Sequence, residues 1–446
     1  MNRRVLIVSP HFAPINAPDG QRVRMSLRYF REFGWEPVVL AVDANYVEAT
    51  VDPLLLESIP TDVPVHRCRA LPVRWTRWLG IGTLGLRAWP FLRQAGDRLL
   101  REQRFDLVYF STTQWITLTL GPRWRRLHGV PFIVDLQDPW VSDYYDRPGA
   151  PRPPGGWKYR FAQWQAKRLE APTFRAAAGF VSVSPVYLEN LRTRYAWFAT
   201  RPAAVVPFGA DEEDLAIARR SVAKPAFTRA PGKLHVLYVG AVGPIMRPAL
   251  ELLFAGVRTL QTTAPTLAMR LRLHFIGTNY APGRRAVAYV QHLANSTGMG
   301  SLVEEIPTRI GYFHALKTML EADALLLLGS DDSGYSPSKI AATGLARRPT
   351  LALIPGGGAL EKTLETAAFA VLARYSPSWE VETVSDFFTN LAAGRVATAD
   401  MSDRVFADCY SARARTREQC AIFDRAVRTG HGSTRGQGQR GGPRSH

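Results

Sequence analysis

Apolar runs of strand length alternate with longer helical patterns along this chain, and the alternation occurs twice. The first series has six runs: Val5–Ser9, Pro37–Val42, Leu107–Ser111, Pro131–Leu136, Phe180–Ser184 and Ala204–Pro207. After a proline-bearing break, Lys224–Gly232, the second series has six more: Leu234–Val239, Leu271–Ile276, Leu302–Ile306, Ala324–Leu328, Thr350–Ile354 and Ala370–Ala373. Strands that alternate with helices predict parallel sheets covered by helices on both faces.

Two such series predict an α/β protein with two Rossmann-like domains whose sheets face a central cleft. A chain of 446 residues is also too long to fold around one ordinary hydrophobic core. We place the first domain at 1–215, a linker at 216–232 and the second domain at 233–401. The helical stretch at 402–427 follows the second sheet and can return to complete the first domain. The Gly-rich basic tail at 429–446 is predicted to be disordered.

The net charge of +18 limits the classes of partner. Removing the three arginines of the tail (Arg435, Arg440 and Arg444) from +18 leaves +15 on the rest of the chain. Such a body attracts polyanions, but no zinc-finger, RNP or helix-turn-helix pattern is present, so phosphates and anionic lipids rank above nucleic acid. No apolar run approaches the length that crosses a bilayer. The N-terminus resembles a strand more than a signal peptide, which predicts a cytoplasmic location.

The segment Ala324–Ile354 carries the most specific chemical signal. A strand-like run ends at Gly329, and a polar loop containing Asp331 and Asp332 follows it. Ser336, Pro337, Ser338 and Lys339 then begin a short predicted helix, with Ser336 as N-cap. Such a turn lies beyond the carboxyl ends of the strands, where its free N–H groups suit a phosphate. Lys339 is one of only seven lysines among 56 basic residues; the alternative is a solvent-facing charge.

Glycines end two other strands of the second series. Gly240 and Gly243 follow Leu234–Val239, and Arg247 comes just after them. Tandem glycines before a helix let backbone N–H groups approach a phosphate closely. Arg247 is either a phosphate ligand or a surface cation. Gly277 ends the next strand and either borders a nucleotide pocket or forms a plain turn.

Polar residues end the strands of the first series in the same way. His11 and Thr113 each follow a strand, and Asp19 with Gly20 occupies the loop after the first one. Asp138 follows Pro131–Leu136 and precedes Pro139-Trp140. Strand-end positions favour a role in binding or catalysis. The alternatives are a structural histidine, an ordinary Asp-Gly turn and a capping aspartate.

Tryptophans and arginines interleave in Val73–Arg104. Trp75, Trp78 and Trp89 alternate there with Arg74, Arg77, Arg87 and Arg93. This mixture is typical of an interfacial helix that binds an anionic membrane surface. The alternative is a core helix, although Gly80, Gly82, Gly85 and Pro90 disfavour one long regular helix.

Several segments together resemble the GT-B glycosyltransferases of the family-4-like group, over most of residues 4–425. The opening RVLIVSPHFAPINAPDGQRVRM resembles that family's first strand, glycine-bearing loop and first helix. IVDLQDPW resembles its DxRDPW-type segment, with Gln137 where arginine or histidine is commoner. VVPFGAD, LYVGAVG, HFIGTNYAP and SPSKIAATGLARRPTLAL follow in the family's order.

The resemblance implies a retaining, metal-independent transfer with a nucleotide sugar as substrate and no cofactor. Asp138 and Asp19 are then the catalytic candidates, with His11 and Thr113 on the acceptor side. The donor-binding candidates are Gly20, Gly240, Gly243, Arg247, Gly277, Asp331, Asp332, Ser336, Ser338 and Lys339. The acceptor is expected to be a saccharide or a lipid-linked hydroxyl in cell-surface polysaccharide or glycolipid synthesis. A lipid acceptor would bring the protein to the inner face of the cell membrane.

The chain departs from the family at the donor loop. Many members carry two glutamates separated by seven residues, the first associated with the transferred sugar and the second with ribose, and those positions are Gly334 and Ala342 here. Asp331 and Asp332 are the nearest carboxylates, and the next one along the chain is Glu361. Two alternatives therefore stand beside transfer: a binding or scaffold protein of polysaccharide assembly that has lost catalysis, and a sugar-nucleotide epimerase.

Overall fold

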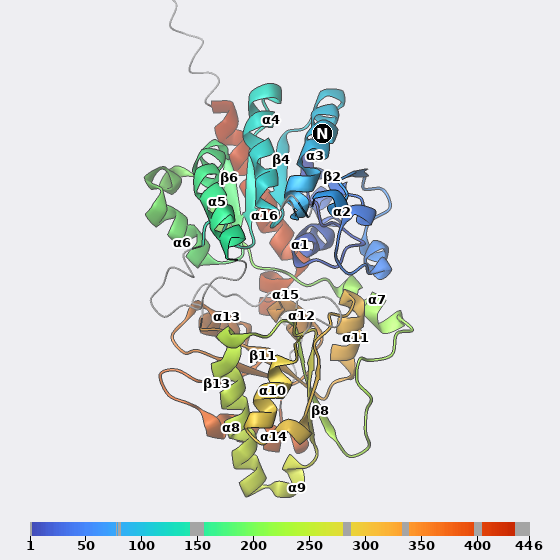
Figure 1. The fold of residues 1–446 in the computed structure, drawn as a ribbon, viewed down its shortest axis with the longest axis vertical. Helices are drawn as coiled ribbons and strands as arrows, with labels where there is room; N and C mark the ends of the chain where they lie inside the picture. Colours follow the sequence, from blue (N-terminus) through green and yellow to red (C-terminus); the bar gives the residue numbers. More distant parts are fainter. Residues whose placement is uncertain are drawn as a thin grey trace, which may run out of the picture. The chain divides into compact units, whose positions relative to one another are not determined.

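The computed structural model describes residues 2–76, 78, 82–142, 156–279, 287–331, 339–396 and 404–432. Contacts between Cα atoms divide the chain into two compact units. The first unit comprises residues 1–207 with 415–446, and the second comprises 208–414 (Figure 1). Each unit is built around its own sheet and core.

The sheet of the first unit has seven parallel strands in the order β3-β2-β1-β4-β5-β6-β7. Their bounds are β1 Arg3–Val8, β2 Trp35–Val42, β3 Val65–Cys68, β4 Leu107–Ser111, β5 Phe132–Leu136, β6 Gly179–Ser182 and β7 Ala203–Val205. Six of the seven match the predicted runs within a few residues. Strand β3 was not predicted, because its four residues VHRC lie at the sheet edge with only Cys68 buried and show no apolar run.

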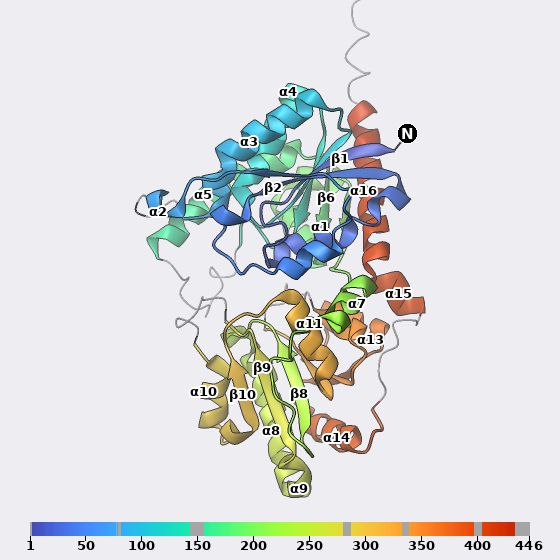
Figure 2. The same ribbon diagram turned by 90° about the vertical axis from the view of Figure 1, so that its right-hand side faces the viewer.

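Helices cover both faces of this sheet. They are α1 Pro18–Ser26, α2 Val73–Thr76, α3 Leu84–Glu102, α4 Leu120–His128, α5 Trp157–Ala176, α6 Pro185–Arg194 and α16 Ala412–Gly432, with 3-10 turns that include η1 Phe30–Phe33 and η4 Trp115–Thr119. In Figure 2, α3, α4 and α5 lie on one side of the sheet and α16 lies on the other.

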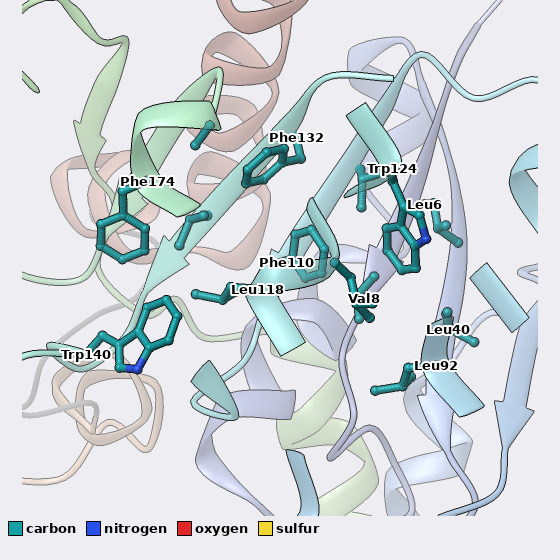
Figure 3. Packing of buried hydrophobic residues seen from close by; sticks show 14 of the residues in the cluster. Leu6, Val8, Leu40, Leu92, Phe110, Leu118, Trp124, Phe132, Trp140 and Phe174 are labelled. Carbon is teal, nitrogen blue, oxygen red and sulfur yellow. The ribbon is translucent and has the colours of Figure 1, made fainter. Parts of the chain in front are cut away.

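Alternate residues of β4 pack against these two layers. Phe110 lies 5.7 Å from the ring of Trp124 in α4 and 5.8 Å from that of Phe132 in β5 (Figure 3). Its neighbour Tyr109 turns to the other face, where its ring lies 4.8 Å from Phe423 of α16. Because both faces are buried, the strand is apolar throughout instead of alternating with polar residues.

The sheet of the second unit has six parallel strands in the order β10-β9-β8-β11-β12-β13. Their bounds are β8 Leu234–Val239, β9 Leu271–Ile276, β10 Val303–Ile306, β11 Ala324–Leu328, β12 Thr350–Ile354 and β13 Val371–Arg374. The helices are α7 Glu212–Arg220, α8 Arg247–Thr263, α9 Pro265–Ala268, α10 Tyr289–Ser296, α11 Tyr312–Glu321, α12 Ile340–Leu345, α13 Ala359–Ala367, α14 Val381–Ala392 and α15 Arg404–Tyr410. The sequence predicted all six strands.

The core of the second unit explains the uninterrupted run in β11. Leu326 and Leu328 belong to the cluster that contains α8 and α14. Leu327 joins a second cluster on the opposite face, with Ile340 of α12 and Leu364 of α13. Both sets of leucines are almost completely buried.

The predicted C-terminal stretch at 402–427 is two helices in the structure. Ser411 separates α15 from α16, and its neighbour Ala412 donates its N–H to the carbonyl of Ala210 over 2.7 Å. The tail from 433 onward lies outside the described residues. Among the residues that the structure describes, no helix is both long and apolar enough to cross a membrane.

Two buried histidines join three strands at one edge of the second sheet. The N–H of Ala230 donates to Nε2 of His235 over 3.1 Å, so Nδ1 of His235 carries the proton that it shares with Nε2 of His274 over 2.9 Å. Nδ1 of His274 then faces Glu304 at 3.1 Å, and Phe227 stacks on both rings. Burial, followed by the charges of neighbouring His235 and Arg272, lowers the pKa of His274 to about 4.

This histidine pair predicts acid sensitivity of the fold. Unfolding restores an ordinary histidine pKa near 6.5, so the unfolded chain takes up a proton that the folded chain refuses. The resulting stability is fully present above about pH 6.5 and declines to a loss of about 3 kcal/mol near pH 4. Urea unfolding followed by circular dichroism should show this slope. His274→Gln, which cannot titrate, should flatten it.

His292→Gln is the matched control, because His292 is exposed on α10 of the same unit. It should keep the pH dependence of the unmodified protein. An unchanged slope in His274→Gln would contradict the assignment of this proton.

Candidate functional site

Asp19 gathers the ends of two neighbouring strands of the first sheet. It is buried, and its carboxylate accepts from Nδ1 of His11 at 3.1 Å and from the backbone N–H and hydroxyl of Thr113 at 3.1 Å each. The hydroxyl of Thr112 adds a fourth contact at 3.2 Å. Burial alone would raise the pKa of Asp19, but the hydrogen bond and charge of His11, aided by Thr113, hold that pKa below its usual value. Asp19 is therefore a fixed carboxylate that orients an imidazole.

Gly20 makes this gathering possible. The sequence placed Asp19 and Gly20 in a loop, whereas both lie in the first turn of α1, which has Pro18 at its first position. A Cβ at Gly20 would lie 2.5 Å from the carbonyl oxygen of His11. Only glycine allows the helix to begin so close to the turn after β1.

A buried ion pair between Arg22 and Asp135 helps to hold α1, the helix that carries Asp19. Nε of Arg22 lies 2.9 Å from Asp135 in β5, and both side chains are almost fully buried. The same guanidinium donates to the carbonyl of Val206 over 2.7 Å. Gln137 donates to Asp135 over 2.7 Å and to the carbonyl of Asp19 over 3.2 Å. The first turn of α1 is thus held to β5 and to the segment that follows β7.

Asp138 follows this network at the end of β5 and retains contact with solvent. Desolvation by the surrounding protein, followed by the negative charge of Asp19, raises the pKa of Asp138 to about 6. One carboxyl group therefore has a lowered pKa, while the pKa of the other is raised to about 6. Environments that separate two carboxyl pKa values in this way are typical of acid–base sites.

In the second unit, the structure brings Lys339 and Gly240 together. Lys339 Nζ lies 5.4 Å from the centre of the Tyr238 ring and occupies the space that a Cβ at Gly240 would fill. Gly240 has a φ of +145°, which favours glycine for a second reason. Desolvation, followed by the positive charge of Arg309, lowers the pKa of Lys339 to about 7. A cation with little hydration, beside a glycine that leaves space for it and near another cation, is prepared to bind an anion.

The helix after this lysine begins later than the sequence predicted. α12 starts at Ile340, so Lys339 stands at its N-cap position and not in its first turn. Ser336, Ser338 and Asp332 lie outside the described residues. Asp331 is exposed, and its N–H donates to the carbonyl of Ile245 over 3.0 Å.

The other donor-side candidates differ in their surroundings. Gly243 precedes a short 3-10 turn, and nothing lies within 4 Å of its missing side chain. Gly277 has a φ of +70°, and its missing side chain would face the Arg309 backbone at 3.7 Å. Arg247 begins α8 as an exposed side chain paired with Glu251 at 2.7 Å. The structure therefore groups Gly277 with Arg309 and Lys339, whereas Arg247 is engaged by its own helix.

Comparison with known proteins gives one family match over part of the chain and similar folds over nearly all of it. Residues 20–209 match the glycosyl transferase 4-like domain family. Solved GT-B structures align along nearly the whole chain. The chain therefore has the GT-B fold, and its residues 20–209 are similar to a glycosyl transferase 4-like domain. No curated protein matches it significantly in sequence.

Three of these structures show how far the fold likeness extends. Sucrose-phosphate synthase from Thermosynechococcus elongatus shares 14% identity at a TM-score of 0.55, covering 97% of this chain and 98% of its own. HepE from Anabaena, solved with UDP and glucose, shares 13% at 0.56, with coverage of 94% and 99%. Trehalose-phosphate synthase (UDP-forming) from Burkholderia xenovorans, solved with glucose-6-phosphate, shares 12% at 0.53, with coverage of 97% and 99%.

The downstream carboxylate Glu361 does not stand in for the family's absent glutamates. Its carboxylate is hydrogen-bonded to the guanidinium of Arg374 and to the N–H of Gly357. These bonds, that to Arg374 first, lower its pKa. Glu361 therefore closes the turn before α13. Of the two positions where many members of the similar family carry glutamate, Ala342 lies within α12 and Gly334 lies outside the described residues.

Sequence reasoning missed several parts of this GT-B site. It did not single out Arg22, Asp135, Thr112 or Arg309. One signal was available: Asp135 interrupts an apolar strand, and a buried carboxylate demands a partner. Arg309 gave no such signal among so many arginines. In the described part of the chain, no group of three or more His, Cys, Asp or Glu side chains could hold a metal ion.

Lys339 yields the first test of the donor site. Lys339→Ala should weaken nucleotide-sugar binding by more than about tenfold, because a desolvated ammonium is lost from an anion site. With a pKa of about 7, the protonated lysine that binds anions is depleted above that pH. Affinity of the unmodified protein should be steady below pH 7 and fall by about tenfold per pH unit above it. Calorimetry across this range measures both effects.

Lys362→Ala is the control, since Lys362 is exposed on α13 of the same unit. It should leave both the affinity and its pH dependence unchanged. Equal affinity in Lys339→Ala and the unmodified protein would remove Lys339 from the donor site.

Proposed function

We propose that this protein transfers a sugar from a nucleotide-sugar donor to a hydroxyl acceptor in the synthesis of cell-surface polysaccharide or glycolipid. The observation that carries the proposal is the placement of Lys339 on Gly240, with Arg309 as second cation. A donor releases a diphosphate during transfer, and a preorganised cationic pocket stabilises that developing charge. HepE was solved with UDP and glucose, so UDP-glucose is the first donor to examine.

The second unit would supply the leaving-group chemistry. The bond between the anomeric carbon and the diphosphate oxygen breaks, and the electron pair leaves with the diphosphate. Lys339, Arg309 and the N–H groups near Gly240 and Gly243 would meet that charge. We propose a metal-independent reaction in which the acceptor oxygen bonds to the same face of the sugar, so that the configuration is retained.

The first unit would orient the acceptor. Asp19 engages Nδ1 of His11, which leaves Nε2 to form a hydrogen bond with an acceptor hydroxyl. Asp138, whose pKa is raised to about 6, is a carboxylate above that pH and can accept a second hydrogen bond. The hydroxyl proton would pass to the departing phosphate oxygen as the new glycosidic bond forms. Positioning of this kind accounts for much of the rate in reactions that need little side-chain chemistry.

The acceptor side predicts a specific pH profile. Protonation of Asp138 below about pH 6 should reduce kcat/KM, giving an acid limb that Asp138→Asn removes. Asp19→Asn should lower kcat/KM by about 100-fold, because the imidazole loses its orienting charge. It should also move the acid limb to lower pH, since the charge of Asp19 contributes to the raised pKa of Asp138. Initial rates of sugar transfer between pH 5 and pH 8 provide the measurement.

Glu102→Gln is the control, because Glu102 is an exposed carboxylate on α3 of the same unit. Donor affinity should remain unchanged in all three variants. An acid limb that stays in place in both Asp138→Asn and Asp19→Asn would show that neither carboxylate governs the rate.

A second candidate function is favoured by the donor loop itself. Ala342 stands where the family carries a glutamate, and Arg374 binds the nearest downstream carboxylate, Glu361. A chain that keeps the phosphate cation and lacks the sugar-contacting carboxylates could bind a nucleotide sugar without transferring it. Such a protein would act as a binding or scaffold subunit in polysaccharide assembly.

One experiment separates the two candidates. Calorimetry with UDP-, GDP- and ADP-sugars identifies the donor, and release of the nucleoside diphosphate is then followed with saccharide and lipid-linked acceptors. Diphosphate release that depends on acceptor supports transfer. Binding without release favours the scaffold, and binding of none of the sugars would reject both.

A further inference from the structure

The arginine- and tryptophan-rich stretch Val73–Arg104 is not one interfacial helix. Most of it packs inward: Arg87 is buried and donates to the carbonyl of Leu71 over 2.8 Å, and Trp89 donates to the hydroxyl of Thr119 over 2.9 Å. Trp75 and Trp78 are the exceptions, with 61% and 80% of their surfaces exposed. For α3 the structure therefore supports the alternative of a core helix, and two solvent-facing tryptophans remain at α2 and just after it.

A second exposed aromatic pair lies on α5. Phe161 and Trp164 are 55% and 54% exposed, and their rings stack at 5.7 Å. Arg168, one turn farther along, lies 5.2 Å from the Trp164 ring. The buried side of the same helix is formed by Ala166, Glu170 and Phe174. This helix therefore presents aromatic and basic side chains together on its outer face.

Both aromatic pairs lie in stretches without acidic residues. Residues 63–96 contain six arginines and no aspartate or glutamate, and residues 147–169 contain six basic residues and likewise no acidic one. Lys158, Arg160 and Lys167 are exposed beside the α5 pair. Among the described basic residues, Arg74 lies 5.5 Å from the Trp75 ring, whereas Arg87 of the first stretch is buried.

Hydrogen bonds connect α3, which follows the first pair along the chain, and α5, which carries the second, to the acceptor edge of the sheet. The N–H of Gly85, at the start of α3, donates to the side chain of Gln114 over 2.7 Å, and Gln114 follows Thr113 directly. Glu170 of α5 accepts from the N–H of Val141 over 2.9 Å, just after Asp138. Trp164 and Phe161 precede Glu170 on the helix by about two turns. In Figure 2, α2 and the beginning of α5 project on the same side of the first unit.

We infer that α2 and the first half of α5 form a docking surface for an anionic lipid bilayer. We call this surface, Trp75, Trp78, Phe161 and Trp164 with their basic neighbours, the aromatic–basic edge. Indole and phenyl rings insert at the headgroup level while arginine and lysine bind anionic headgroups. The inference rests on the proposed function, because docking there brings His11, Thr113 and Asp138 toward the interface. It assigns the acceptor hydroxyl to a lipid-anchored saccharide.

Vesicle flotation with the full chain tests the inference. Vesicles of phosphatidylcholine alone are compared with vesicles in which about one third of the lipid is phosphatidylglycerol. The protein should float with the anionic vesicles several-fold more than with the neutral ones, and added salt should weaken this binding. The double variants Trp75→Ser/Trp78→Ser and Phe161→Ser/Trp164→Ser should each reduce the partition coefficient by about tenfold or more.

Trp379→Ser is the matched control, because Trp379 is 44% exposed in the second unit. It should float like the unmodified protein. Equal flotation of the double variants and the control would overturn the inference. So would an absence of binding to anionic vesicles, or a self-association in sedimentation velocity that the double variants abolish.

Donor calorimetry on the same variants keeps the two proposals apart. The double variants should bind the nucleotide sugar like the unmodified protein, which also shows that they are folded. Loss of vesicle binding with intact donor binding supports the aromatic–basic edge. Donor binding without any vesicle binding leaves transfer possible and rejects only the membrane surface, whereas vesicle binding without donor binding rejects the proposed function.

Discussion

The buried ion pair between Arg22 and Asp135 determines the geometry of the first unit's site. Two charges removed from water need further hydrogen bonds to offset their lost hydration. Here Gln137 and Ser111 donate to Asp135, and the carbonyl of Val206 accepts from Arg22. The constraint fixes the position of α1 relative to β5, and the helix carries Asp19 to the end of β4. Truncation of either charged partner would leave the other charge buried and unpaired, so the site's geometry and the unit's stability are linked.

The fold was largely predictable because its strands are buried on both faces. A segment such as β11 has no polar positions, and a parallel sheet between two helical layers is the arrangement that buries such a run on both faces. β3 escaped because an edge strand of four residues with one buried side chain has no such pattern. The same reasoning failed for Val73–Arg104, where composition cannot tell a tryptophan on the core from one in solvent. Trp89 and Trp78 both lie among arginines in the sequence. In the structure Trp89 is hydrogen-bonded to Thr119, whereas Trp78 is 80% exposed.

The site was predictable in its positions and less so in its contacts. Strand ends identified His11, Asp19 and Lys339, because parallel strands present their carboxyl ends at one edge. The contact between Asp19 and His11 could not be predicted from sequence, since it depends on how closely Gly20 lets α1 approach the turn after β1. Nor did it show that Arg309 lies near Lys339. Contacts of this kind depend on tertiary packing, which pairs residues tens of positions apart.

The two units prepare their charges by opposite means. Asp19 stays ionised because hydrogen bonds from His11 and Thr113 outweigh the cost of burial. Lys339 loses hydration and lies near the positive charge of Arg309, so its pKa falls. A bound anion would therefore stabilise the desolvated ammonium group of Lys339. The carboxylate of Asp19 already has its hydrogen-bond partners and orients the imidazole of His11. This preparation of Lys339 to bind an anion does not depend on the two glutamates that many members of the similar family carry.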